Sequence, residues 1–349
     1  IIDSYDILEN SLSFNLYSDN LSVDAEFMVF ENLDKNNSDR YEYILPSLNL
    51  VKKIENKSRF GGNFFLKSNN LIRNYDTNIF EKKNINDLVF NSNPKITSSG
   101  FYNNYNVIFK NVNSDTQNSN NFKEDENFYF SGLVQYNSSL PFVKKTETTN
   151  KILKPKLSLK ISPENNSKDL SEEDIKLDVN NIFNLNRVSR SDTVEGGFSL
   201  AYGNDFIIFD REKSKDVFVL KLANNLRFSE NKDLPRNVQL GQKTSNFLGE
   251  LLYSPNEIFK TKYNISTKNN ISELNYENLI TELSLNNFVT TFDYLNENNT
   301  VSKNSYLKST LKYDVNESNN FQFSTRENKT SDLTEYYNFM YQYKNDCLT

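Results

Sequence analysis

The chain of 349 residues contains no histidine, no tryptophan, one cysteine and two methionines. Without histidine it lacks the side chain most often used as a general base and as a metal ligand. A single cysteine excludes a disulfide within the chain and a cysteine-based zinc site. We therefore expect a protein that is not an enzyme, with no catalytic residues, no metal site and no cofactor. The formal net charge is -6, and no nucleic-acid partner is expected.

Long hydrophobic runs are also missing, so no segment is apolar enough to form a membrane helix. Ile1 does not open a signal peptide, because no basic and then apolar run follows it. The chain begins abruptly and stops at Thr349 within an alternating stretch. We interpret it as part of a longer protein, so the missing signal does not bear on location.

What the chain does contain is aromatic side chains. Hydrophobic residues make up only 36% of it, yet 20 are tyrosine and 27 are phenylalanine. Disordered segments are poor in aromatic residues because they bury nothing. Some apolar environment must therefore hold these rings. Asparagine is the most visible polar residue, which an AT-rich genome explains, and it often stands where turns are expected.

Short stretches of alternating apolar and polar residues recur along the chain, for example in 157–161, 259–265, 307–315 and 337–343. A period of two places the apolar residues on one face of a β-strand and the polar residues on the other. Polar turns rich in asparagine separate the stretches. The pattern predicts many antiparallel strands.

Two architectures fit this alternation: a soluble sandwich with its apolar face inward, and a transmembrane barrel with its apolar face in lipid. Strands long enough to cross a bilayer, aromatic residues near strand ends and a polar opposite face favour the barrel. The predicted fold is all-β, a large antiparallel transmembrane β-barrel, incomplete, with about 14 to 16 strands.

Two polar stretches without this period, near 111–126 and 162–193, predict long loops. Barrels of this kind have long extracellular loops, so we expect both outside. In the second, residues 171–174 resemble a capping box. The residues that follow at helical spacing leave a short helix and a plain coil both open: Ile175, Val179, Ile182 and Phe183.

A few other features allow two interpretations each. The acidic run 172–174 could bind a divalent cation, although a solvated helix start explains it better. The lysine doublets at 52–53, 82–83 and 144–145 suit either lipid phosphates or ordinary surface charge. Pro155 precedes an alternating stretch, and proline at a strand start costs no hydrogen bond. A lone cysteine such as Cys347 is usually a small buried residue.

The segment 178–203 is the most specific part of the chain. It contains Asp-Val-Asn-Asn-Ile-Phe-Asn-Leu-Asn-Arg, then Asp-Thr-Val-Glu-Gly-Gly, then Leu-Ala-Tyr-Gly. Together with the motifs at 43–48, 153–163, 246–255 and 341–347, it resembles the lipopolysaccharide-assembly family LptD (OstA). The likeness covers nearly the whole chain, so we take 1–349 as one partial C-terminal barrel domain. The motif residues are Pro155, Asn186, Arg187, Asp192, Glu195, Gly196, Gly197, Tyr202 and Gly203.

The resemblance implies a protein of the cell outer membrane that assembles lipopolysaccharide into the outer leaflet, without covalent chemistry. It implies as partners lipopolysaccharide, an LptE-like lipoprotein in the lumen, an LptA-like periplasmic lipid bridge and outer-membrane lipid. The alternative is another outer-membrane barrel, a porin or nutrient receptor. Such a protein would share the alternation but not the motif at 178–203.

The resemblance also gives Cys347 a role. In the family, a cysteine or adjacent pair at this place bonds to cysteines of an N-terminal periplasmic domain. Here Asp346 precedes a single Cys347, which leaves one possible bridge, with its partner outside this chain. The lipid-accepting domain and the strands that form the lateral gate are expected to be missing, so we expect the isolated chain not to transport.

Overall fold

The computed structural model describes residues 6–56, 61–119, 125–164, 168–188, 190–269, 271, 273–299 and 303–344. These residues form one sheet of 19 strands. In this part of the chain the only helical elements are two short 3-10 turns, η1 and η2. Among the same residues no helix has the length and apolarity needed to cross a membrane.

The elements follow one another in simple order along the chain. Their bounds are β1 Ile7–Ser18, β2 Leu21–Asn32, η1 Asn37–Arg40, β3 Tyr41–Ile54, β4 Gly62–Tyr75, β5 Ile79–Ser92, β6 Lys95–Ile96, β7 Tyr102–Gln117, β8 Asp125–Ser139, β9 Phe142–Lys145, β10 Thr149–Ser162, η2 Asn181–Phe183, β11 Gly197–Asp210, β12 Lys215–Arg227, β13 Phe247–Tyr253, β14 Phe259–Thr267, β15 Leu274–Leu285, β16 Phe288–Asn298, β17 Lys303–Asn316, β18 Asn319–Asn328 and β19 Leu333–Tyr343.

Neighbouring strands pair antiparallel, mostly as hairpins. Some turns have only two residues: Leu285 of β15, for example, pairs with Phe288 of β16 across such a turn. The short strands β6 and β9 extend the edges of β7 and β10. The sheet has 19 strands, more than the predicted count of about 14 to 16. That prediction allowed too many residues for each turn.

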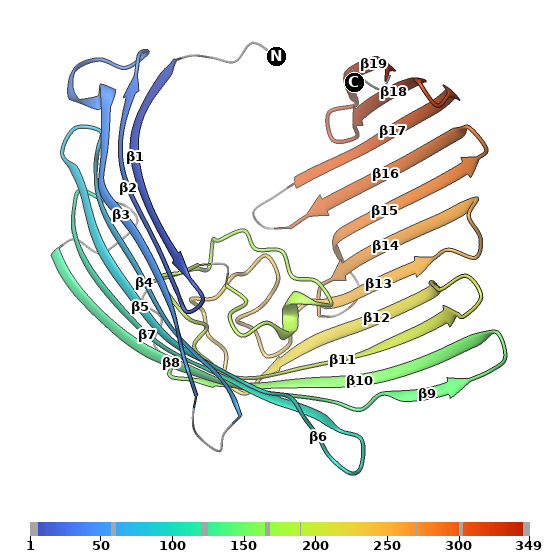
Figure 1. Ribbon diagram of the computed structural model, residues 1–349, viewed down its shortest axis with the longest axis horizontal. Coiled ribbons are helices and arrows are strands. Elements are labelled where there is room, and N and C mark those ends of the chain that lie inside the picture. Colours follow the sequence, from blue (N-terminus) through green and yellow to red (C-terminus); the bar gives the residue numbers. More distant parts are fainter. Residues whose placement is uncertain are drawn as a thin grey trace.

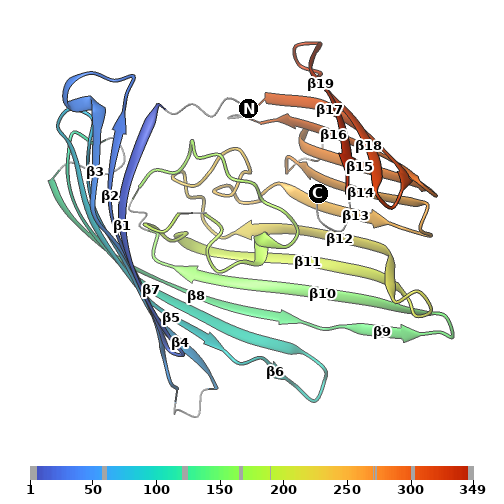
Figure 2. The ribbon, with the colours of Figure 1, turned by 45° about the horizontal axis from the view of Figure 1, so that its top comes forward.

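The sheet curls into a trough that stays open along one side (Figures 1 and 2). β1 and β19 lie on opposite sides of the opening. Among the described residues no register joins these two strands; β1 pairs with β2 and β19 with β18. The predicted fold class, a large antiparallel sheet of the barrel type that does not close, is confirmed.

The two faces of the sheet have the polarity of a barrel. In β10, Ser158 and Lys160 are 0% and 2% exposed, whereas Leu157 and Ile161 are 39% and 53% exposed. A soluble sandwich would bury the leucine and expose the lysine. Polar residues inside and apolar residues outside are typical of a sheet whose outer face meets lipid.

The connections at the two ends of the sheet differ in length. At one end lie the loops 163–196 and 228–246, and we call it the long-loop end. At the other end lie turns such as 19–20, 211–214 and 286–287, and we call it the short-turn end.

The loop predicted near 111–126 is mostly strand. β7 continues to Gln117 and β8 begins at Asp125. Ser114 and Thr116 are buried on one face of β7, while Asn113 and Asp115 occupy the other. Because both faces are polar here, the alternation that would reveal the strand is absent from the sequence.

The loop predicted near 162–193 is present as 163–196, but its course differs from the expectation. The described residues of this loop form no α-helix, and only η2 is helical. The carboxylate of Asp169 accepts the Ser171 N–H at 2.8 Å, a local turn that competes with a helix. The loop also folds back onto the concave face of the sheet instead of extending outward (Figures 1 and 2).

Candidate functional site

Two loops cover part of the concave face, and we call residues 163–196 and 228–246 the inner loop layer. The two loops bond to each other through their backbones. The Leu170 N–H donates to the Asp233 carbonyl at 2.8 Å, and the Arg236 N–H donates to the Ser171 carbonyl at 3.0 Å. They form a single folded unit, since buried backbone groups need such partners.

An apolar cluster attaches the inner loop layer to the sheet. Each fully buried aliphatic side chain contributes roughly 1.5–3 kcal/mol relative to exposure, so this contact is substantial. Residues of both loops meet inward-facing residues of β11, β12 and β13. The buried members are Leu170, Leu177, Val179, Ile182, Val188, Ala201, Ala223, Leu234, Val238, Leu240 and Leu248.

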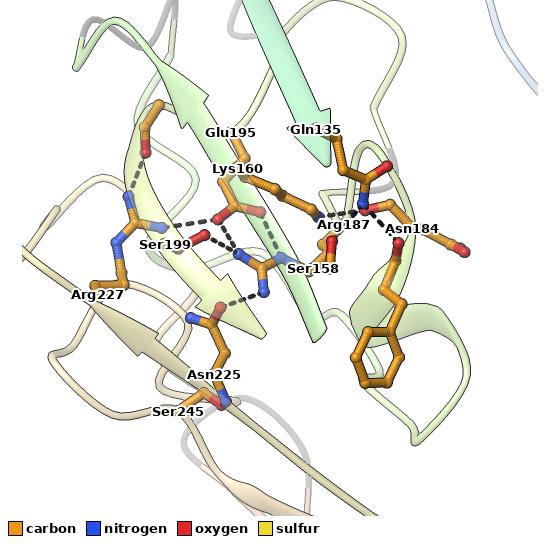
Figure 3. A network of polar contacts seen from close by, with 12 residues as sticks. Gln135, Ser158, Lys160, Asn184, Arg187, Glu195, Ser199, Asn225, Arg227 and Ser245 are labelled. Atoms are coloured by element: carbon orange, nitrogen blue, oxygen red, sulfur yellow. Dashed lines mark hydrogen bonds and ion pairs between the residues drawn. The ribbon is translucent and has the colours of Figure 1, made fainter. Parts of the chain in front are cut away.

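An ion pair within the motif stands beside this cluster. Arg187 Nε donates to Glu195 Oε2 at 2.6 Å, and Arg187 Nη2 donates to Glu195 Oε1 (Figure 3). The two side chains are 0% and 2% exposed. This fork-to-fork geometry is the strongest arrangement for an arginine and a carboxylate. It closes the loop between residues 187 and 195 on itself.

The strands complete the coordination of this pair. Arg187 Nη1 donates to Asn225 Oδ1 of β12 at 2.7 Å, and its Nη2 donates to Ser199 Oγ of β11 at 2.9 Å. Arg227 Nη1, also from β12, donates to Glu195 Oε1 at 2.7 Å, and its Nη2 donates to the Gly196 carbonyl (Figure 3). The loop is thus bonded to two strands.

A third cation, Lys160, acts on the carboxylate of Glu195 in addition to Arg187 and Arg227. Lys160 of β10 is 2% exposed, and its Nζ donates to the Asn184 carbonyl of the loop (Figure 3). Next to it, Gln135 of β8 donates to Ser158 Oγ at 2.8 Å and to the Phe183 carbonyl at 2.7 Å. The loop backbone therefore supplies acceptors to groups on β8 and β10.

Glu195 is the only carboxylate among the residues of this network labelled in Figure 3, where it faces Lys160, Arg187 and Arg227. Burial by itself would raise the pKa of Glu195. The charges of Arg187, Lys160 and Arg227 and the hydrogen bond from Arg187 outweigh burial and lower this pKa to about 2. Glu195 is consequently ionised at any physiological pH, and the network depends on its charge.

Asp192 belongs to a second ion pair in the same loop. Arg190 Nε and Nη2 donate to its two carboxylate oxygens at 2.9 and 2.8 Å, and Arg190 Nη1 reaches Glu173 at 2.9 Å. Burial would raise the pKa of Asp192, but the hydrogen bond and charge of Arg190 lower it. This pair ties the two halves of loop 163–196 together.

A third contact joins the loop to the other wall of the trough. Lys110 of β7 is 2% exposed; its Nζ lies 2.6 Å from Asp87 Oδ1 of β5 and donates to the Ser191 carbonyl at 2.6 Å. Val194 packs beside it with Ile108 and Leu133. The inner loop layer is therefore anchored to β5, β7 and β8 as well as to β10–β13.

The remaining motif residues shape the backbone around these pairs. Asn186 Nδ2 donates to the Arg190 and Thr193 carbonyls, both at 3.2 Å. At Gly203 an added Cβ would lie 2.6 Å from the Leu222 carbonyl and 3.0 Å from the Phe183 ring. Tyr202, the residue before Gly203, is 44% exposed and points away from the layer.

Three further positions were singled out from the sequence: Pro155, Gly197 and Cys347. Pro155 lies within β10 and not at its start: its carbonyl accepts the Leu140 N–H at 3.1 Å where the pairing partner changes from β8 to β9. At this break the missing proline N–H costs nothing. Gly197 has φ +95°, a region that favours glycine. Cys347 lies outside the described residues.

Several residues of the network were not singled out from the sequence, namely Lys160, Asn225, Arg227 and Ser199. A charged residue at an inward position of an alternating stretch, such as Lys160, was the available signal. The acidic run 172–174 has a different role from a cation site: Glu172 pairs with Arg236 and Glu173 with Arg190, both at 2.9 Å. Across the described residues no cluster of acidic, cysteine or histidine side chains could hold a metal ion.

Beyond the layer, alternating charges cross the inner wall from β10 to β14. Lys156 and Asp205 are 2.8 Å apart, and Glu250 lies 2.8 Å from Lys221 and 3.2 Å from Lys262. Asp205 and Lys221 are register partners on β11 and β12. The inner wall is therefore polar along five neighbouring strands.

A comparison with protein families agrees with this geometry. The family described as "LptD: LPS transport system D" matches residues 3–331. The chain belongs to the LptD family. The match includes the whole motif at 178–203 and confirms the resemblance seen in the sequence. LptD is a transport family, and membership points to the outer membrane, to lipopolysaccharide handling and to partners in that transport pathway.

Two other comparisons add little. No curated protein matches the chain significantly. Among solved structures, the siderophore receptor PirA from Acinetobacter baumannii is similar with a TM-score of 0.37 and 9% identity. The alignment covers 93% of this chain and 66% of the receptor.

Proposed function

We propose that this LptD-family chain is the barrel part of an outer-membrane translocon subunit that assembles lipopolysaccharide into the outer leaflet. The observation that carries the proposal is the family match over residues 3–331.

The polarity of the two faces supports the proposal. Lipopolysaccharide combines acyl chains with a large, strongly hydrated saccharide. The row of alternating charges from Lys156 to Lys262 offers a saccharide a wet wall, whereas exposed apolar residues such as Ile161 face the lipid. A sheet with these two faces can keep the two parts of one substrate in different solvents.

The same wall supports a lumenal partner, which we propose to be an LptE-like lipoprotein. Beyond the inner loop layer, the inner faces of β15–β19 carry polar pairs. Asn278 donates to Asp293 at 2.7 Å, and Arg326 pairs with Glu335 at 2.9 Å. Polar pairs of this kind suit a partner that docks in a wet lumen. An LptA-like periplasmic bridge would deliver the lipid at the short-turn end.

The test is depletion of the native full-length protein from its cells. New lipopolysaccharide should stop reaching the cell surface, as measured by labelling of surface-accessible saccharide after a metabolic pulse. Uptake of small solutes should stay unchanged. Normal surface arrival together with lost solute uptake would contradict the proposal and favour a porin or nutrient receptor.

A further inference from the structure

The outward face of β4, β5, β7 and β8 changes in polarity along the strands. Ile108 and Leu133 pack with Val194 of the inner loop layer, so these residues mark the inner face. Residues of the opposite parity, including Phe109 and Asn111, therefore point outward. On β4, β5 and β7 this outward face is apolar near the middle of the strands and polar toward the long-loop end, whereas on β8 it carries the exposed rings of Phe128 and Phe130.

The change takes place within one register step. The row Leu66, Leu88 and Phe109 is apolar and exposed. The next two rows across β4, β5 and β7 are Ser68, Asn86 and Asn111, and then Asn70, Asn84 and Asn113. Ser68 Oγ donates to Asn86 at 2.7 Å, and Asn113 Nδ2 donates to Asn84 at 3.2 Å. Amide side chains on the outer face are costly in hydrocarbon. In the same two rows β8 carries the exposed rings of Phe130 and Phe128, which are typical of the membrane interface, so these rows lie at the edge of the hydrocarbon.

The pairing of β8 supports the same boundary independently. β10 pairs with β8 only from Val134 to Ser139. From Asp125 to Leu133, β8 has a paired strand on one side only, namely β7. A strand edge open to lipid is not tolerated within the bilayer. The end of β8 that begins at Asp125 therefore projects past the membrane at the long-loop end, which is the extracellular end in barrels of this type.

A pocket of about 400 Å³ opens on this projecting face, which is within the size range of small-molecule sites. Phe128, 71% exposed, stands at its rim. The walls carry amides and charges from three strands: Lys82, Asn84, Asn113, Asp115 and Glu126.

The chemistry of the pocket selects its ligand. Lys82 is outnumbered by the carboxylates Asp115 and Glu126, so a phosphate or another anion is disfavoured. Within the described part of the chain, the side chains of Lys82, Asp115 and Glu126 form no ion pair or hydrogen bond. Amides and charged groups supply donors and acceptors together, as a ring of hydroxyl groups requires. The exposed ring of Phe128 offers a flat apolar face beside them.

We propose that this pocket binds a saccharide on the outside of the barrel, just above the hydrocarbon. The nearest source is the sugar of a glycolipid in the outer leaflet, with a free oligosaccharide as the second source. The inference uses the outer-membrane placement within the proposed function but does not require transport. It concerns the outer face, away from the lumen.

The test uses the native full-length protein with its partners in phospholipid nanodiscs. One arm measures the dissociation constant of a neutral, lipid-free oligosaccharide by calorimetry. The other counts lipopolysaccharide molecules retained by the protein from nanodiscs that contain it, by mass spectrometry. Phe128→Ala should weaken saccharide binding by about tenfold. The matched control is Phe142→Ala, which removes a ring 53% exposed at the short-turn end and should change nothing.

Binding in both arms supports the proposal with the saccharide alone as ligand, and binding only from the bilayer supports it with the glycolipid as source. No binding in either arm, or equal losses in the two variants, overturns it. Lys82→Met and Asp115→Asn are two further variants of the same pocket. Their folding is verified by comparing the gel mobility of heated and unheated protein. If lipopolysaccharide still reaches the surface while the pocket binds nothing, only the pocket is refuted.

Discussion

Arg187 and Glu195 form a two-pronged ion pair that is almost entirely excluded from solvent and is completed by Arg227. Both members come from one loop, while Arg227 comes from β12. A buried pair with several cations around one carboxylate is costly to disturb, because any missing charge leaves the others desolvated and unpaired.

Glu195→Gln should therefore destabilise the folded protein by about 3–5 kcal/mol. The amide keeps the shape of the side chain but removes the charge that contacts both Arg187 and Arg227. The measurement is the urea concentration at the midpoint of unfolding. Folded and unfolded protein are distinguished by their different mobility on gels run without boiling.

The matched control is Glu172→Gln. Glu172 also pairs with an arginine, Arg236, but the two side chains are 76% and 62% exposed. Exposed pairs contribute about 0–1 kcal/mol, so this variant should unfold near the native midpoint. Equal shifts in the two variants would refute the structural role of Glu195.

Acid should weaken the same contact. The folded-state pKa of Glu195 is about 2, below the ordinary value of 4.5. Because the pKa is lowered on folding, this contribution is complete above about pH 4.5 and is lost as the pH falls toward 2. Urea midpoints measured across this range should fall with pH in the native protein, with a shallower slope in Glu195→Gln. Identical slopes would exclude Glu195 as a source of the acid sensitivity.

Gly203→Ala should destabilise the wall under the inner loop layer by about 1–3 kcal/mol. The new methyl group would meet the Leu222 carbonyl at 2.6 Å, and backbone cannot rotate away. Gly132→Ala is the control, because its Cβ would meet the ring of Phe109 at 3.1 Å, and that exposed side chain can turn. Unfolding midpoints should differ clearly between the two, and a larger loss in Gly132→Ala would count against this packing.

Lys110→Met should loosen loop 163–196 without unfolding the sheet. The substitution removes the contacts to Asp87 and to the Ser191 carbonyl while keeping the length of the side chain. Limited proteolysis of the folded protein should cut the loop faster than in the native protein. The control is Lys95→Met, at an exposed lysine of β6, which should leave the rate of proteolysis unchanged. An unchanged rate in Lys110→Met would show that the contacts of Lys110 are not needed to hold the loop.

The proposed bridge from Cys347 has a direct readout in the full-length native protein. Gels run with and without reductant should show a mobility shift that disappears in Cys347→Ser. The chain contains one cysteine, so any bond must reach a partner outside it. A shift that persists in the variant would assign the disulfide elsewhere.

The sequence predicted the face of each strand better than the course of each loop. In β10 the alternation correctly separates Leu157 from Ser158, because burial follows a period of two there. In β7 the alternation fails after Asn111, because Ser114 and Thr116 on one face and Asn113 and Asp115 on the other are all polar. A rule based on apolar contrast cannot detect such a strand.

Loop 163–196 shows a second limit. Val179 and Ile182 have helical spacing, yet they are buried because the loop lies on a sheet. The spacing of apolar residues indicates that they are buried, but it does not show which part of the protein buries them. The motif resemblance pointed to Arg187 and Glu195, but Arg227 lies 32 residues beyond Glu195 on another strand. Only the folded path of the chain brings it to the carboxylate.

The anchoring of the inner loop layer to both walls sets an order of events in time. Lys110 is synthesised before the loop, Arg227 after it, and Lys110 lies 81 residues before Ser191. Glu195 can meet Arg187 within its own loop, but it meets Arg227 only where β12 is paired with β11. The full set of contacts that fixes the inner loop layer therefore requires that β12 has paired.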